Sequence, residues 1–172
     1  AAEWNCSATS GEYTLSSDCV VSSQVEVMGI LSLTGVVNAS GLLPRLVGGG
    51  SGVPDANGVL PKIIGGGSNR LFKVESGGEL LLKRLNLTGG DITGKECTSP
   101  YEHCMGGAIH IYLAGALDAR ECAFVGNKAH YGGSIAGWQN SKVMLVDSNV
   151  TNSFALNHGG GVVLYSSSSS LS

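Results

Sequence analysis

A pair of glycines returns at a nearly constant interval in the second half of the chain. The pair opens three similar segments, 26 and 27 residues apart, which read Gly106-Gly107-Ala108-Ile109, Gly132-Gly133-Ser134-Ile135 and Gly159-Gly160-Gly161-Val162. Repeats of roughly 20 to 50 residues are typical of proteins whose units bury their apolar faces against neighbouring units. The interval therefore predicts a stack of similar units.

Each glycine pair leads into a short stretch in which apolar side chains alternate, which indicates a strand. Alignment on the glycines places Ile109, Ile135 and Val162 on one face, which we expect to point inward, and His110 on the outward face. A second strand follows in each unit, and Leu80–Leu87 and Val25–Leu33 resemble earlier copies of it. No stretch has a sustained helical period, and 27 glycines with many Ser, Thr and Asn suit tight corners between strands.

We therefore expect an all-β fold, a right-handed parallel β-helix (single-stranded solenoid) with about three short strands per coil. Inward ladders of apolar residues account for 42% hydrophobic against 13% charged residues. A β-sandwich is the alternative for a chain rich in Gly and Ser, but β-sandwiches do not repeat a sequence motif at a constant interval.

Two tetrapeptides with Phe and Asn, Phe124-Val125-Gly126-Asn127 and Phe154-Ala155-Leu156-Asn157, accompany the glycine pairs. The alternation of GGAI-like and F-x-x-N segments over about residues 105–165 resembles the repeat of the chlamydial polymorphic outer-membrane proteins and of similar microbial and algal surface proteins. The resemblance implies a β-helix, and no single function, because the signature is shared by adhesins and structural proteins. We expect each Phe to fill the core and each Asn to bind corner backbone.

Two regions are expected: an N-terminal cap region, 1–24, with a disulfide, and a parallel β-helix, 25–172, with an inserted loop near 95–104. Upstream, residues 41–51 recur as 58–68, which we interpret as two strand-and-corner pieces. The segment Val162–Ser172 has no charge and no proline, so we expect the last coil either to continue into further residues or to pack head-to-tail on another copy.

Five cysteines are present, and their spacing pairs Cys6 with Cys19 and Cys97 with Cys104. Cys122 then remains as a buried thiol in an inward ladder with Leu85 and Ser148. Two alternatives stay open: Cys122 as a nucleophile or intermolecular bridge, and zinc at Cys97, His103 and Cys104. Local disulfides favour an extracellular or cell-surface location.

Four N-x-Ser/Thr sequons stand at Asn5, Asn38, Asn86 and Asn149. Asn86 and Asn149 occupy the same place in their repeats, so we expect both on one exposed edge, glycosylated if the source is a eukaryote. The chain begins without a charged leader, which we expect of a mature secreted protein after cleavage and equally of a chain cut at an arbitrary boundary. With net charge −3, no basic stripe and no transmembrane run, neither a nucleic-acid partner nor a membrane span is expected.

The residues considered for polysaccharide chemistry are Asp91, Asp118, Asp147, Glu121, Arg84 and Arg120. Alignment stacks Arg84, Glu121 and Asp147, which predicts a solvated ion-pair column, and His110 is expected to be a surface histidine. No catalytic residue, metal or cofactor is therefore expected. An outward aromatic column of Tyr112, Trp138 and Tyr165 is either a self-stacked ladder or a contact for a glycan or a partner.

The sequence thus predicts a structural or adhesive β-solenoid module of a secreted glycoprotein, part of an extracellular filament or cell-surface assembly that forms by head-to-tail stacking. The alternative function is a polysaccharide-active β-helix enzyme, such as a lyase or epimerase, or a carbohydrate-binding module.

Overall fold

The computed structural model describes residues 1–36, 60–98, 101–165 and 170–172, and these form an all-β structure. All pairings between the described strands are parallel. Three larger sheets and one two-stranded sheet account for these strands. The fold class is therefore all-β with parallel sheets, as the repeat predicts.

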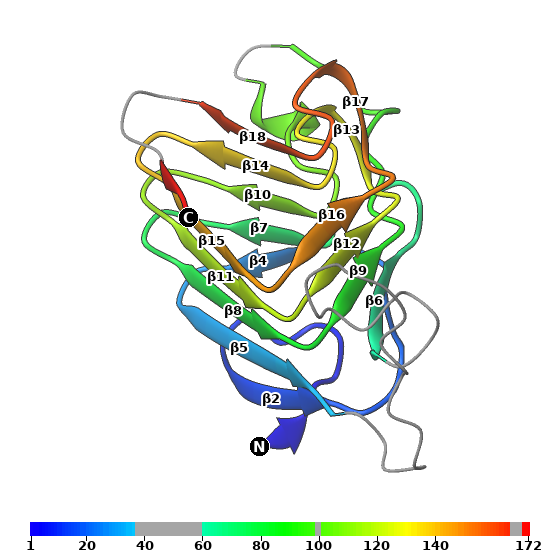
Figure 1. Ribbon diagram of the computed structural model, residues 1–172, viewed down its shortest axis with the longest axis vertical. Helices are drawn as coiled ribbons and strands as arrows, with labels where there is room; N and C mark the ends of the chain where they lie inside the picture. The colour runs from blue at the N-terminus through cyan, green and yellow to red at the C-terminus, as the bar shows by residue number, and fades with distance from the viewer. Residues whose placement is uncertain (37–59, 99–100, 166–169) are drawn as a thin grey trace.

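The strands of each sheet come from successive parts of the chain (Figure 1). The first sheet contains β1 (Ala2–Glu3), β2 (Gly11–Leu15), β5 (Ile30–Gly35), β8 (Glu79–Lys83), β11 (Ala116–Arg120), β15 (Lys142–Val146) and β19 (Ser170–Leu171). The second contains β3 (Cys19–Val21), β6 (Lys62–Gly65), β9 (Asn86–Thr88), β12 (Ala123–Val125) and β16 (Asn149–Thr151). The third contains β4 (Val25–Val27), β7 (Phe72–Val74), β10 (Ile109–Ile111), β14 (Ile135–Trp138) and β18 (Val162–Tyr165).

The chain visits these sheets in a fixed order, and we call one passage through all three a circuit. One circuit runs through β8, β9 and β10, the next through β11, β12 and β14, and the last through β15, β16 and β18. The two later circuits add β13 (Lys128–Tyr131) and β17 (Phe154–His158), which pair with each other. A single 3-10 turn, η1 (Glu102–Cys104), lies between β9 and β10.

Equivalent residues of successive circuits lie opposite one another. Ile109 pairs with Phe72 on one side and Ile135 on the other, and Ile135 pairs with Val162. The predicted inward stacking of these isoleucines and Val162 is confirmed. Their side chains join buried residues of the other two sheets in one apolar core cluster.

Two separate features of the backbone explain why glycine occupies the two positions of the repeated pair. The first glycine of each pair adopts a left-handed conformation, with φ of +65° at Gly106, +61° at Gly132 and +66° at Gly159, which residues with a Cβ rarely adopt. The second glycine packs against the next circuit: a Cβ on Gly107 would overlap the carbonyl oxygen of Gly133. A Cβ on Gly106 would instead overlap the carbonyl oxygen of Ile109 in its own segment, and one on Gly160 would make only an ordinary contact with Ser153 O at 3.8 Å.

The Phe-x-x-Asn prediction is correct for one copy and wrong for the other. Phe124 is buried, and the Asn127 amide binds three groups: it accepts from Gly90 N (3.0 Å) and donates to Leu87 O (3.1 Å) and Ser134 Oγ (3.0 Å). Phe154 is 52% exposed and Asn157 is exposed. The strand register explains the error, because Val150 is the residue that pairs with Phe124.

The N-terminal residues contribute to the first circuit, which runs through β2, β3 and β4. β2 and β3 lie within residues 1–24 and pair with β5 and β6. Trp4 is 3% exposed, its ring stacks on Phe72 with 5.8 Å between centroids, and its Nε1 donates to Ala8 O. The Trp4 side chain therefore completes the apolar core at this end.

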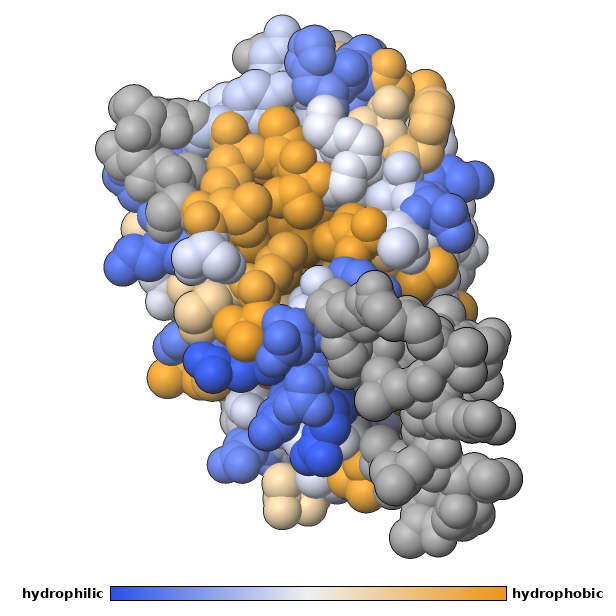
Figure 2. Space-filling model, in the orientation of Figure 1, coloured by the Kyte–Doolittle hydropathy of each residue, from blue (hydrophilic) through white to orange (hydrophobic). Residues whose placement is uncertain are grey.

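The last complete circuit lacks such a covering residue in the described part of the chain. Four apolar side chains of β15, β16 and β18 are only partly buried against the core, and we call them the open end: Leu145, Val150, Val162 and Leu164. Figure 2 shows a broad apolar area over the region that β14, β15, β16 and β18 border in Figure 1.

Of the upstream duplication, residues 41–51 lie outside the described residues, and β6 lies in the second copy.

Candidate functional site

Both disulfides predicted from spacing are present. Cys6 is bonded to Cys19 and Cys97 to Cys104, with Cα–Cα distances of 5.9 and 5.3 Å. The second bridge closes the loop between β9 and β10, in the region predicted as an insertion. Because both sulfurs of that loop are bonded to each other, Cys97 and Cys104 have no thiolates to offer to zinc.

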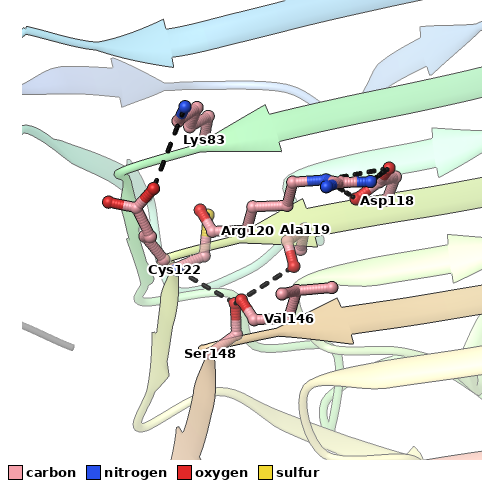
Figure 3. Close-up of polar contacts among 8 residues, drawn as sticks. Lys83, Asp118, Ala119, Arg120, Cys122, Val146 and Ser148 are labelled. Atoms are coloured by element: carbon pink, nitrogen blue, oxygen red, sulfur yellow. Dashed lines mark hydrogen bonds and ion pairs between the residues drawn. The ribbon is translucent and has the colours of Figure 1, made fainter. Parts of the chain in front are cut away.

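Cys122 is a free thiol inside the stack, as predicted, directly before β12 (Figure 3). Its backbone N donates to Ser148 Oγ (3.0 Å), and its Sγ donates to Arg120 O (3.2 Å). Burial raises the pKa of the thiol to about 12. The neutral thiol is a poor nucleophile, so the geometry favours a packing role for Cys122.

The predicted ion-pair column is wrong in its partners. Arg84, Glu121 and Asp147 do occupy equivalent corner positions, with φ of +54°, +54° and +48°. The ion pairs of this region instead join Lys83 to Glu121 (3.9 Å) and Arg120 to Asp118 (2.9 Å), as Figure 3 shows. At positive φ the side chain leaves the line of the strand, so the column of Cα positions does not predict which charges meet.

The carboxylates considered for polysaccharide cleavage are tied to nearby groups. Asp118 binds Arg120 through both of its oxygens, and Asp91 Oδ1 accepts from Thr93 N and Oγ1 while its Oδ2 lies 3.7 Å from Lys128. A glycosidase needs two carboxyl groups facing each other across the bond that breaks. Asp118 and Asp91 instead form ion pairs and hydrogen bonds with neighbouring residues, an arrangement that favours a structural role for them.

His110 is not a surface histidine. It faces outward from β10, but its side chain is fully buried, with Nδ1 3.4 Å from Arg70 Nη1 and its ring against Tyr112. Burial, together with the charges of Arg70, Lys73 and His103, holds the pKa of His110 well below its usual range. The imidazole is therefore neutral, and the outward face of the third sheet is partly covered here.

The predicted aromatic column is only partly formed. Trp138 pairs with Tyr165 in register and their rings lie 5.6 Å apart. Tyr112 lies against His110 instead. Tyr131 joins the group through Tyr165 (5.8 Å), Tyr101 (6.2 Å) and His158 (5.8 Å). We call Trp138, Tyr165, Tyr131, Tyr101 and His158 the aromatic cluster; the position of Tyr131 directly before Gly132 was the available sequence signal.

The sequons differ in exposure. Asn5 is exposed, with its Oδ1 accepting from Ser7 and Ala8, whereas Asn149 is partly buried. Asn86 is 4% exposed, so the predicted exposure at this position is wrong. Asn86 pairs with Lys62 on one neighbouring strand and with Ala123 on the other. Ala123 in turn pairs with Asn149, so the predicted equivalence of Asn86 and Asn149 is correct. Asn38 lies outside the described residues.

In the described ranges, no group of three or more His, Cys, Asp and Glu side chains is arranged to hold a metal ion. The same residues contain no helix with the length and apolar character needed to cross a membrane. Comparison with protein-family models, curated proteins and solved structures finds no match to this chain. Its function must therefore be argued from its own residues.

Proposed function

We propose that the chain is a right-handed parallel β-helix that serves as a structural or adhesive module of an extracellular assembly and associates with further copies through its open end. Three parallel sheets visited in a fixed order support the architecture. Two disulfides are compatible with an oxidising, extracellular environment.

The open end is the observation that carries this proposal. Val150, Val162 and Leu164 pack against the core on one side only, whereas their counterparts Phe124 and Ile135 are fully buried. Stacking one more layer on these side chains would remove them from water, which stabilises an interface by about 25 cal/mol for each Å² of apolar surface.

The backbone of the same end favours a second copy as the occupant. β16 and β18 are the last strands of the second and third sheets, and neither contains a charged residue or a proline, the features that usually prevent edge pairing. β3 and β4 are the first strands of the same two sheets. A copy placed head-to-tail would bring these edges together, and such a contact propagates into filaments because it need not close.

Analytical ultracentrifugation over a range of protein concentrations tests the proposal. The wild-type protein should form species larger than a monomer as concentration rises, and Leu164→Lys should remove them. Leu81→Lys is the matched control, because Leu81 is a partly buried leucine in the middle of the first sheet, away from the open end. A wild-type protein that stays monomeric, or equal loss in both variants, would contradict the proposal.

A carbohydrate-binding role is the second candidate, and the aromatic cluster favours it. Trp138, Tyr165 and Tyr131 are partly buried side chains with neighbouring rings, and aromatic faces provide large contact areas at low entropic cost. Titration with neutral oligosaccharides, followed by Trp138 fluorescence, tests this role. A response that is lost in Tyr165→Ala would support it.

A further inference from the structure

A pocket of about 390 Å³ lies over the outward face of the third sheet; its described lining contains no residue of the open end or of the aromatic cluster, although its His103 lies two residues after Tyr101. Its walls come from β4, the segment before β7, β7 itself and the loop between β9 and β10. The lining residues that matter here are Glu26, Asn69, Arg70, Lys73, Lys95 and His103. A volume in this range suits a small ligand.

Positive charge dominates the described lining. Arg70, Lys73 and Lys95 are cations, and Glu26 is the one carboxylate among the described lining residues. Lys73 is also shared with Glu75, whose carboxylate is 2.8 Å away. Lys95 is exposed, and Arg70 is 5% exposed. The pocket therefore combines a solvent-facing cation with a buried guanidinium, an arrangement that favours an anion.

Two buried polar atoms beside these cations have no hydrogen-bond partner in the structure. One is the side-chain Oδ1 of Asn69, whose Nδ2 donates to Arg70 O. The other is Nε2 of His110. Since Arg70 Nη1 can only donate, Nδ1 of the neutral His110 is the acceptor, and Nε2 carries the proton. The region thus has an unused acceptor and an unused donor, and buried groups of this kind normally find partners.

We propose that this pocket binds an acidic sugar, with the carboxylate held by Lys95 and Arg70 and a ring hydroxyl donating to Asn69 Oδ1. A bare inorganic anion would satisfy the cations but would leave this acceptor unused, whereas a polyhydroxy acid supplies both an oxyanion and hydroxyl donors. None of the described lining residues lies in the last circuit, but Glu26 belongs to β4, one of the edges that the proposed head-to-tail contact would use, so binding is to be measured at protein concentrations at which the chain is monomeric.

The Cys97–Cys104 disulfide holds the outer wall of this pocket. Lys95 lies two residues before Cys97, and His103 directly precedes Cys104. His103 therefore lies within the segment that the bridge closes and Lys95 lies just outside it, so the bridge restricts the backbone beside both side chains and reduces the ordering cost of binding.

Titration calorimetry with glucuronate, glucose and sulfate tests the inference on the wild-type chain. We expect glucuronate to bind at least about tenfold more tightly than glucose and more tightly than sulfate, because only glucuronate uses both kinds of contact. Lys95→Gln should weaken glucuronate binding about fivefold. Lys142→Gln is the matched control, since Lys142 is an exposed lysine on β15.

Three outcomes would overturn the proposal: equal affinity for glucuronate and glucose, equal or tighter binding of sulfate, or an affinity that Lys95→Gln leaves unchanged. An NMR titration locates the site independently of affinity. Shifts at Asn69, Arg70 and His110 would support it, while shifts confined to Trp138 and Tyr165 would assign sugar binding to the aromatic cluster and contradict this pocket.

Discussion

At the N-terminal end of the stack, Trp4 is 3% exposed and its ring stacks on that of Phe72, whereas at the open end Val162 and Leu164 remain partly buried. The same repeat unit therefore ends in a finished core on one side and an incomplete layer on the other. Stacked repeats need a covering residue or a further unit at each end. The covered end is therefore expected to contribute more to the stability of the isolated chain, and the open end is the surface through which the chain is proposed to associate.

The largest expected effect is at the covered end. Trp4→Ala should lower the free energy of unfolding by about 3–5 kcal/mol, because it removes a buried aromatic side chain and leaves a cavity over Phe72. Trp138→Ala is the control within the same chain: Trp138 is partly buried, and its loss should cost about 1–2 kcal/mol. Urea unfolding followed by circular dichroism measures both. Equal costs would remove the distinction between the ends.

A second comparison uses one corner position in two successive circuits. Asn127 and Ser153 each follow the paired residues Phe124 and Val150 by three positions, and Ser134 Oγ lies between their side chains, 3.0 Å from Asn127 Nδ2 and 2.7 Å from Ser153 Oγ. Asn127→Ala should cost about 2–4 kcal/mol, because Gly90 N and Leu87 O lose their side-chain partner in a buried corner.

Ser153→Ala, nearer the open end, should cost about 1 kcal/mol or less, since the hydroxyl's contacts with Ser134 Oγ and Thr151 O are lost where water can enter. The same urea titration compares the two variants. A Ser153→Ala cost as large as that of Asn127→Ala would show that the last circuit is as well packed as the one before it.

Cys122 and Ser148 offer a third comparison, since they occupy equivalent positions and Ser148 is partly buried. The Cys122 thiol has a pKa of about 12, so above about pH 9 an unfolded chain loses this proton while the folded chain keeps it. The unfolded state then binds fewer protons, and stability falls as pH rises from about 9 to 12, by at most about 1.4 kcal/mol per pH unit.

The control is Cys122→Ser, which removes this contribution while other groups titrate unchanged, so the difference between the two pH profiles is the quantity to measure. In that background, Ser148→Cys places a thiol closer to the open end. It should react with iodoacetamide at pH 8 about tenfold faster than wild-type Cys122 does. Equal rates would mean that the thiol of Cys122 is accessible.

The glycine interval was sufficient to predict the parallel stacking, because the same left-handed corner recurs at Gly106, Gly132 and Gly159 and so sets the same register in each circuit. It predicted the pairing of Ile109 with Ile135 and the role of Asn127 for the same reason: both depend on register. The disulfides followed from short spacing, since Cys6 with Cys19 and Cys97 with Cys104 each close a local loop.

Features that depend on what covers the outer faces could not be predicted in this way. His110 alternates outward as expected, but Arg70 and Tyr112 lie against it, and the repeat contains no information on non-repeating segments. Asn86 is buried for a related reason, since its neighbours Lys62 and Ala123 come from other circuits. Phe154 shows a different limit: its motif matches, but it pairs with Lys128 and not with Phe124.

The effect expected at Leu164 in the isolated chain is as small as that at Ser153, and it tests the comparison most directly. Leu164→Ala removes a partly buried side chain and should cost about 1 kcal/mol at low protein concentration, where the open end faces water. If a second copy covers this end, burial of Leu164 is completed only in the assembly, so the cost of the substitution should grow as protein concentration rises. Leu33→Ala, at a fully buried position of β5, should cost more but equally at all concentrations. Thermal unfolding of the three proteins across a hundredfold concentration range distinguishes the cases, and a Leu164→Ala cost that does not vary with concentration would leave the open end as an ordinary exposed surface.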